Sequence, residues 1–190
     1  MYGPVIEGSR FRLRPPRPED APLMVAWLED VEVTARLMIR FPPSLDEEEE
    51  WLRQRARDRD ALAWAIEHEG RLVGVTGFDQ IDWRNLHATS GTVIGDKRVW
   101  GRGIGGEVMR LRADFAFTEL PLRKLKSAYL EGNEASRRAQ RGAGYREVGR
   151  LRQEVYRQGR WLDLILTELL REEWEAGRRG QAQSRPSPGP

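Results

Sequence analysis

The chain has 190 residues, of which 39% are hydrophobic, 33% charged and 8% aromatic. This composition is typical of a folded globular domain and excludes a disordered or fibrous protein. The 32 basic and 30 acidic residues nearly balance, which argues against a nucleic-acid partner, and the absence of Cys excludes disulfides and zinc–thiolate sites. With His68 and His87 as the only histidines, we expect no metal site.

The sequence predicts neither a membrane helix nor an N-terminal signal peptide. No segment reaches the roughly 20 apolar residues of a membrane helix, and charges interrupt residues 1–14, where a signal peptide would be apolar. We therefore expect a cytoplasmic protein without a membrane partner. The length predicts one domain over residues 1–176. Residues 177–190 are rich in Gly, Pro, Arg and Gln and are predicted to form a disordered tail.

The first half of the chain begins with a strand, continues with helices and returns to strands. Residues 10–14 alternate basic and apolar side chains, which predicts a half-buried strand with a solvated polar face. Helices are expected to begin at Pro18 and, with capping-box spacing, at Ser44; the second is highly charged and predicted to face solvent. A short helix is expected between them at residues 33–38. Three strands then form an antiparallel meander, at residues 62–68, 72–78 and 88–95.

From Ile104 the hydrophobic period changes from two residues to nearly four. Ile104, Val108 and Leu111 lie on one face of a helix predicted over residues 104–120. The remaining predicted elements are a strand at residues 124–130, a short helix at 134–141 and a closing hairpin of strands at 145–156 and 161–169. Alternating strands and helices of this kind predict an α/β domain.

A glycine-rich segment precedes the long helix: Gly101, Arg102, Gly103, Ile104, Gly105 and Gly106. Glycines here let backbone N–H groups close on an anion at the helix N-terminus. The letters fit a dinucleotide site, another phosphate-bearing ligand or a tightly packed turn. A dinucleotide site is disfavoured because five residues separate the strand from the first glycine and because the nearest acid, Glu131, lies 131 − 106 = 25 positions beyond the last one. A nucleotide P-loop would need Gly-Lys followed by Ser or Thr, which does not occur.

The segment from Ile94 to Gly105 resembles the acetyl-CoA signature of the GNAT acyltransferases, in the form found around the RimJ and RimL ribosomal-protein N-acetyltransferases. The family pattern is Gln or Arg, two residues, Gly, one residue, and Gly or Ala. Set on Gly103 and Gly105, it places Trp100 in the first position. A second register uses Arg98, Gly101 and Gly103, and both registers keep the same backbone segment at the helix start.

Later segments resemble the same branch. Asn133 and Ser136 match its Asn-x-x-Ser helix, Gly144 and Tyr145 its Gly-Phe ending, and Asp163 an acid common in its last strand. The resemblance implies the GNAT (acyl-CoA N-acyltransferase) fold over residues 1–176, a mixed, mostly antiparallel sheet flanked by helices with a V-shaped splay between two parallel strands. It also implies that acetyl-CoA is bound by Val93, Ile94, Gly95, Gly101, Arg102, Gly103, Ile104, Gly105, Gly106, Asn133 and Ser136.

The activity implied by the resemblance is direct transfer of the acetyl group of acetyl-CoA to a primary amine, on a protein N-terminus or a small molecule, in a ternary complex. The amine must lose its proton before it attacks. The Glu that relatives carry near Thr89 and Ser90 is absent, and the Tyr that protonates the thiolate in many relatives falls at Gln140. Ser136 is the catalytic candidate.

Several alternatives stay open. Water, Asp79 or Glu67 could replace the missing base, His87 is a further candidate, and Trp83 could line the substrate entrance. The missing Glu and Tyr also fit a non-catalytic acetyl-CoA-binding sensor or partner-binding protein. The resemblance allows a homodimer, for which the edge of the closing hairpin offers a surface.

Overall fold

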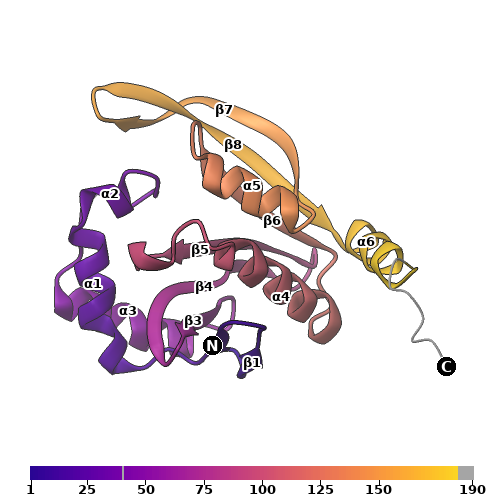
Figure 1. The fold of residues 1–190 in the computed structure, drawn as a ribbon, viewed down its shortest axis with the longest axis horizontal. Helices are drawn as coiled ribbons and strands as arrows, with labels where there is room; N and C mark the ends of the chain where they lie inside the picture. Colours follow the sequence, from indigo (N-terminus) through magenta and orange to yellow (C-terminus); the bar gives the residue numbers. More distant parts are fainter. Residues whose placement is uncertain (40, 184–190) are drawn as a thin grey trace.

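The computed structural model describes residues 1–39 and 41–183, in which eight strands, six α-helices and two short 3-10 turns follow one another (Figure 1). The strands are β1 (Ile6–Glu7), β2 (Arg12–Arg14), β3 (Leu62–His68), β4 (Arg71–Asp82), β5 (His87–Ile94), β6 (Lys124–Leu130), β7 (Arg146–Arg157) and β8 (Arg160–Leu170). The helices are α1 (Ala21–Glu29), α2 (Val31–Thr34), α3 (Leu45–Arg57), α4 (Ile104–Glu119), α5 (Glu134–Gly142) and α6 (Arg171–Gln183), with 3-10 turns η1 (Pro18–Asp20) and η2 (Lys97–Val99).

The strands form one sheet in the order β1-β2-β3-β4-β5-β6-β8-β7. Among the described residues every neighbouring pair is antiparallel except β5 and β6, which run parallel. That parallel pair is joined only where His87–Thr89 faces Lys124–Lys126, although the strands continue to Ile94 and Leu130. The predicted V-shaped splay between two parallel strands is therefore confirmed.

Helices cover both faces of the sheet, which gives the domain two apolar layers. On one face α4 packs against β2, β3 and β4 through Val108, Trp64 and Phe78, all at most 1% exposed. On the other face α1 and α3 pack through Met24 and Leu52. The periodicity from Ile104 onward therefore predicts the helix and its buried face correctly.

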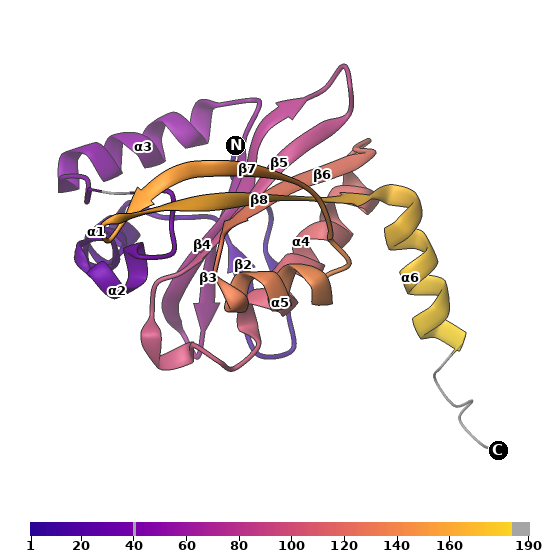
Figure 2. The ribbon, with the colours of Figure 1, turned by 90° about the horizontal axis from the view of Figure 1, so that it is seen from above.

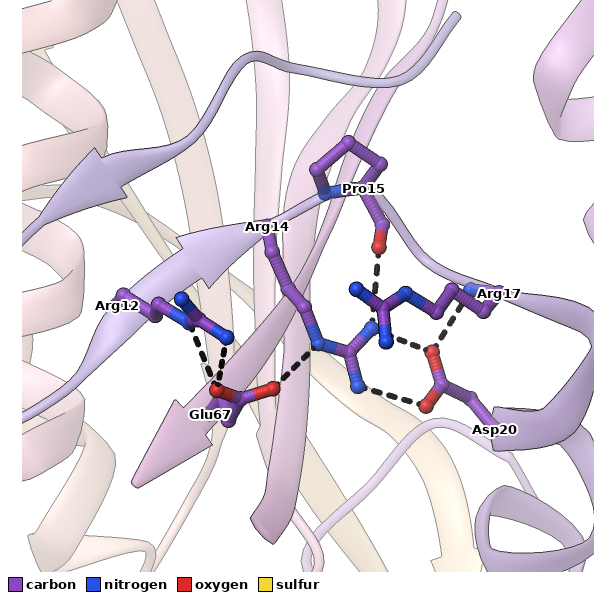
Figure 3. Close-up of polar contacts among 6 residues, drawn as sticks. All are labelled: Arg12, Arg14, Pro15, Arg17, Asp20 and Glu67. Carbon is purple, nitrogen blue, oxygen red and sulfur yellow. Dashed lines mark hydrogen bonds and ion pairs between the residues drawn. The ribbon is translucent and has the colours of Figure 1, made fainter. Parts of the chain in front are cut away.

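The sequence prediction for β2 is wrong on one point, because its polar face is not solvated along its whole length. Arg14 is only 6% exposed, since η1 and α1 begin beside it. Its guanidinium donates to Asp20 at 2.8 Å and to Glu67 at 2.7 Å, and Arg12 reaches the same Glu67 (Figure 3). Alternation identifies the strand, while the burial of Arg14 depends on carboxylates supplied by other elements.

The segment after α1 also differs from its prediction. Helix α2 ends at Thr34, so the helix expected at residues 33–38 does not continue. The carbonyls of Leu37, Met38 and Ile39 instead accept hydrogen bonds from Arg157 Nη2, at 3.1, 3.1 and 3.2 Å. Strands β7 and β8 form a long hairpin, and its tip meets this segment near α2 (Figures 1 and 2).

Helix α6 covers part of the predicted tail. It extends through residues 177–183, while residues 184–190 lie outside the described residues. Arg178 pairs with Asp114 at 3.5 Å and lies over the ring of Trp174, which ties this helix to α4. Within residues 1–39 and 41–183, no helix combines the length and the hydropathy of a membrane span.

Candidate active site

The splay leaves one edge of β5 open. Gly95 N–H donates to Val73 O at 3.0 Å, and hydrogen-bonded pairs recur at every second residue of an antiparallel ladder. Val93 therefore faces β4, whereas Thr92 and Ile94 turn their N–H and C=O groups toward the opened side. Such an edge can pair with an extended ligand as an added strand would. Gly95, one of the expected coenzyme contacts, instead uses its N–H inside the sheet.

Trp100 lies at the end of this edge. Its indole Nε1 donates to Ile94 O at 2.9 Å, so the side chain folds back over the last residue of β5. This contact gives a physical role to the Trp that stands where the family pattern has Gln or Arg. It ties the glycine-rich segment to the open edge.

The glycine-rich segment forms the start of α4, as predicted. Gly101 and Gly103 have φ values of 75° and 79°, in the left-handed region that glycine adopts without strain. The first bond inside the helix runs from Glu107 N–H to Gly103 O at 3.2 Å. The N–H groups of Ile104, Gly105 and Gly106 precede that bond and have no intrahelical acceptor, so they can bind an anion together with the helix dipole. Arg102 is exposed beside them.

Helix α5 begins at the open end of the splay directly after β6. Asn133 caps it by accepting a hydrogen bond from Ser136 N–H at 3.1 Å. Ser136 Oγ accepts from Gln140 Nε2 at 3.1 Å, and in the described part of the chain this hydroxyl donates to no acceptor. Because α4 also starts at this end and packs against α5 through Gly106 and Ala139, the predicted site residues of both helices share one end of the sheet.

Gln140 holds Ser136 in place. It is 2% exposed, donates to Ala128 O at 3.2 Å and accepts from Thr167 Oγ1 at 2.5 Å. These bonds connect α5 with β6 and β8. Gln140, at the position of the family's Tyr, is therefore an orienting residue in this structure and has no acidic proton to give.

A cavity of about 760 Å³ lies between α1, α3, the segment after α2 and strands β4 and β5. Its walls are largely apolar and include Trp27, Trp51 and Val75. The cavity also touches Gly91, Thr92 and Val93, which belong to the opened strand. A ligand paired with β5 and a second ligand in the cavity would therefore meet at Gly91–Val93.

The charged groups facing this cavity are Glu47, Glu48, Arg55 and Asp79. Arg55 is paired with Asp79 and lies over the Trp51 ring, and Glu47 Oε2 accepts from Ser44 N–H at 2.7 Å. Glu48 differs, because its carboxylate has no hydrogen bond or ion pair among the described residues although it is 7% exposed. Burial raises the pKa of Glu48.

The sequence analysis missed Glu48 because it treated the helix after Ser44 as solvent-facing. The signal was present in the spacing: Glu48 lies four residues before the buried Leu52, on the face of α3 that packs against α1. A second missed residue is Arg112, 1% exposed, four residues after Val108 on the buried face of α4. Its Nη1 donates to Gly91 O, Thr76 Oγ1 and Thr92 Oγ1 at 2.5, 2.6 and 2.7 Å, beneath the opened strand.

The other sequence candidates lie elsewhere or are already paired. Glu67 lies in the network with Arg14, and its pKa is lowered because hydrogen bonds from Arg14 and Arg12 outweigh the opposing effect of burial. His87 lies at the paired end of β5, away from the opened edge, near Asp82 at 3.7 Å.

Two further residues singled out in the sequence have structural partners. Trp83 Nε1 donates to Asp60 Oδ1 at 3.0 Å. Asp163 accepts from Gln153 N–H at 2.8 Å and pairs with Arg150. Within residues 1–39 and 41–183 no group of three metal-ligating side chains lies together.

Comparisons with known proteins agree with this geometry. A family profile described as "Acetyltransferase (GNAT) domain" matches residues 10–146. The Bacillus subtilis protein named "Putative ribosomal N-acetyltransferase YdaF" is 32% identical over 126 residues, covering 66% of this chain and 68% of that protein. The structure of a spermidine N-acetyltransferase from Vibrio cholerae, in complex with CoA and spermine, has a TM-score of 0.82 at 20% identity over 88% of this chain and 99% of that one. The ribosomal L7/L12 acetyltransferase RimL, in complex with coenzyme A, has a TM-score of 0.78 at 17% identity over 87% and 97%. At these identities the last two comparisons show the fold.

Proposed function

The chain belongs to the GNAT family of acetyltransferases, and from this premise we propose that it transfers the acetyl group of acetyl-CoA directly to a primary amine bound in the cavity. The observation that carries the proposal is the junction at Gly91–Val93, where the opened edge of β5 meets the cavity of about 760 Å³. Donor and acceptor bound in these two places would lie next to each other, which is what direct transfer needs.

The residues present fit the donor, acetyl-CoA. The free N–H and C=O groups of Thr92 and the N–H of Ile94 suit the amides of an extended pantetheine arm. The N–H groups of residues 104–106 and the positive end of the α4 dipole suit a diphosphate. As donor substrate, acetyl-CoA supplies the acetyl thioester that the amine attacks.

On the side of α5, Ser136 is proposed to act on the leaving sulfur. Its hydroxyl accepts from Gln140, so its own proton is free to be donated to a thiolate. Asn133 holds the first turn of α5 and with it the position of Ser136. No covalent enzyme intermediate is required, which agrees with a chain of 190 residues without Cys.

The test begins with calorimetry of acetyl-CoA binding, followed by release of free coenzyme A in the presence of a panel of primary amines. We expect binding and amine-dependent release. Gly105→Leu should weaken binding about tenfold or more, because its Cβ meets no atom closer than Ile94 Cγ1 at 3.9 Å and the larger side chain would then cover the anion site. Gly142→Leu on α5, whose Cβ meets no atom within 4 Å, is the matched control.

Two outcomes would contradict the proposal. Absence of binding heat, with equal behaviour of both glycine variants, would remove the donor site. Binding without turnover on every amine would favour the non-catalytic acetyl-CoA-binding protein instead. Cytoplasmic location and a homodimer formed through the β7 edge stay predictions.

A further inference from the structure

Glu48 is a buried acid that has no partner among the described residues. It lies in the first turns of α3, is 7% exposed, faces the cavity, and makes no hydrogen bond or ion pair within residues 1–39 and 41–183. The other charged groups facing the cavity are satisfied: Arg55 and Asp79 pair with each other, and Glu47 is bound by Ser44. Burial of most of the side chain disfavours the ionised carboxylate, so this position favours either a proton or a cation bound in the cavity.

Resting on the proposed function, we propose that Glu48 binds the ammonium group of the acceptor and takes its proton, and that the acceptor is a small primary monoamine with an apolar, aromatic body. A raised pKa brings a carboxylate closer to the working pH and makes it a better general base. The ammonium supplies the missing partner of Glu48, and the walls of the cavity supply the surface for the apolar body.

The charges of the cavity separate this substrate from others. Glu48, the cavity-facing carboxylate without a partner among the described residues, matches one ammonium group, whereas the further ammonium groups of a polyamine such as spermidine would have to compete for Glu47 and Asp79, which Ser44 and Arg55 already hold. An amino acid would bring a carboxylate, and the only cation facing the cavity in the described part of the chain, Arg55, is already held by Asp79. A peptide would bring backbone N–H and C=O groups that apolar lining side chains such as Met24 and Leu28 cannot satisfy.

The ammonium passes one proton to Glu48, and the neutral nitrogen then forms a bond with the acetyl carbonyl carbon while the carbon–sulfur bond breaks. The nitrogen loses a second proton, which ends on the leaving sulfur by way of Ser136 or water. The products are the N-acetylated amine and free coenzyme A, and the proton on Glu48 passes to solvent.

The test of the substrate class compares a matched series of acceptors with the full-length enzyme and acetyl-CoA: 2-phenylethylamine, L-phenylalanine, a tetrapeptide with N-terminal phenylalanine, and spermidine. We expect kcat/KM to be highest for 2-phenylethylamine, by about tenfold or more over each of the others. A tenfold preference for spermidine, the amino acid or the peptide would overturn the substrate assignment.

The test of the residue uses Glu48→Gln, which keeps size and removes the charge, and Glu48→Asp, which keeps the charge. Glu49→Gln on the same helix removes an exposed charge that does not face the cavity and is the control. We expect Glu48→Gln to lower kcat/KM about 100-fold at neutral pH, Glu48→Asp to restore part of it and Glu49→Gln to stay within about twofold.

The pH profile supplies a readout that a structural role would not move. The wild type should show an acidic limb of kcat/KM above pH 4.5, the ordinary value for a Glu carboxyl, because only ionised Glu48 accepts the proton. Glu48→Gln should lose this limb and gain activity with pH as free amine accumulates, so that its deficit shrinks under alkaline conditions. An unchanged profile in Glu48→Gln would overturn the role of this residue.

Calorimetry of acetyl-CoA binding distinguishes a failure of the inference about Glu48 from a failure of the proposed function. If Glu48→Gln binds acetyl-CoA as the wild type does and turns over every amine as fast, the inference about Glu48 fails while the proposed function stands. If the wild type neither binds acetyl-CoA nor acetylates any acceptor, the proposed function itself fails.

Discussion

Glu67 and Glu48 are nearly equally buried, 9% and 7% exposed, and their pKa values are shifted in opposite directions. Glu67 receives hydrogen bonds at 2.7 Å from both Arg12 and Arg14, which lower its pKa despite burial (Figure 3). Glu48 receives none among the described residues, and burial alone raises its pKa. Among the described residues, a guanidinium partner therefore distinguishes the structural carboxylate of Glu67 from the carboxylate of Glu48, which we propose for chemistry.

The two surroundings come from different parts of the fold. Glu67 lies on β3 opposite Arg12 of β2, so strand register delivers its partner, and Arg14 then continues the network to Asp20. Glu48 lies on α3 above a cavity, where the neighbouring Arg55 is held by Asp79. Substitutions of each acid and of its neighbours test whether these surroundings set the two opposite pKa shifts.

The largest effect is expected from Arg14→Met, which removes the centre of the network. Asp20 then loses its ion-pair partner while remaining buried, and Glu67 keeps only Arg12. Breaking a buried pair by removing one member typically lowers the free energy of unfolding by about 3–5 kcal/mol. Urea unfolding of Arg14→Met and of the control Arg12→Met, whose side chain is 43% exposed, should give a much larger loss for the first. Equal losses for the two variants would show that burial of the Arg14–Asp20 pair adds nothing to the free energy of unfolding.

The next effect concerns Glu67→Gln and its dependence on pH. At neutral pH the neutral side chain should lower the free energy of unfolding by about 2 kcal/mol, because charged hydrogen bonds to two arginines are replaced by weaker ones. The folded pKa of Glu67 lies below the ordinary 4.5, so this contribution is present above pH 4.5 and lost as the pH falls through the folded pKa. Unfolding measured at pH 7 and near pH 3 should therefore show the difference shrinking in acid. A difference independent of pH would contradict the assignment.

Local features of the fold could be predicted from the sequence. Strands β3 and β6 agree with their predictions to the residue, because their apolar runs are bounded by turn-forming residues. The capping box at Ser44 and the glycines before Ile104 specify helix starts through contacts between near neighbours in the chain. For the same reason the anion-binding part of the candidate site was accessible to sequence analysis.

The acceptor side was not accessible, because it depends on contacts between distant segments. Whether Glu48 faces a cavity depends on how α3 packs against α1 and β4, and whether Arg14 is buried depends on Asp20 and Glu67. Residues 37–39 do not continue a helix because Arg157, about 120 residues later, binds their carbonyls. Local propensity contains none of these contacts.

A smaller effect, of opposite sign to that of Glu67→Gln, is expected for the stability of Glu48→Gln. Because the folded pKa of Glu48 is raised, the ionised form destabilises the fold above that pKa, and the cost disappears below pH 4.5. The neutral side chain should therefore raise the free energy of unfolding at pH 8 by about 1 kcal/mol, and the gain should vanish near pH 4. Thermal unfolding without ligands measures this, with Glu49→Gln as control. A loss of stability at pH 8 would mean that Glu48 has a partner in solution.

The smallest effect is expected at residues 37–39, which lie at one wall of the cavity that Glu48 faces. Arg157 on the hairpin β7–β8 holds the carbonyls of residues 37–39, and Ile39 lines the cavity. Arg157→Gln should loosen this wall and raise KM for the amine about threefold, while kcat, acetyl-CoA affinity and the pH profile of Glu48 stay unchanged. Arg160→Gln on the same hairpin, which removes an equally charged but exposed side chain, should leave KM unaltered. A lower kcat with an unchanged KM in Arg157→Gln would contradict this expectation. The β7–β8 hairpin would then influence the reacting groups near Glu48, and not only the position of the cavity wall.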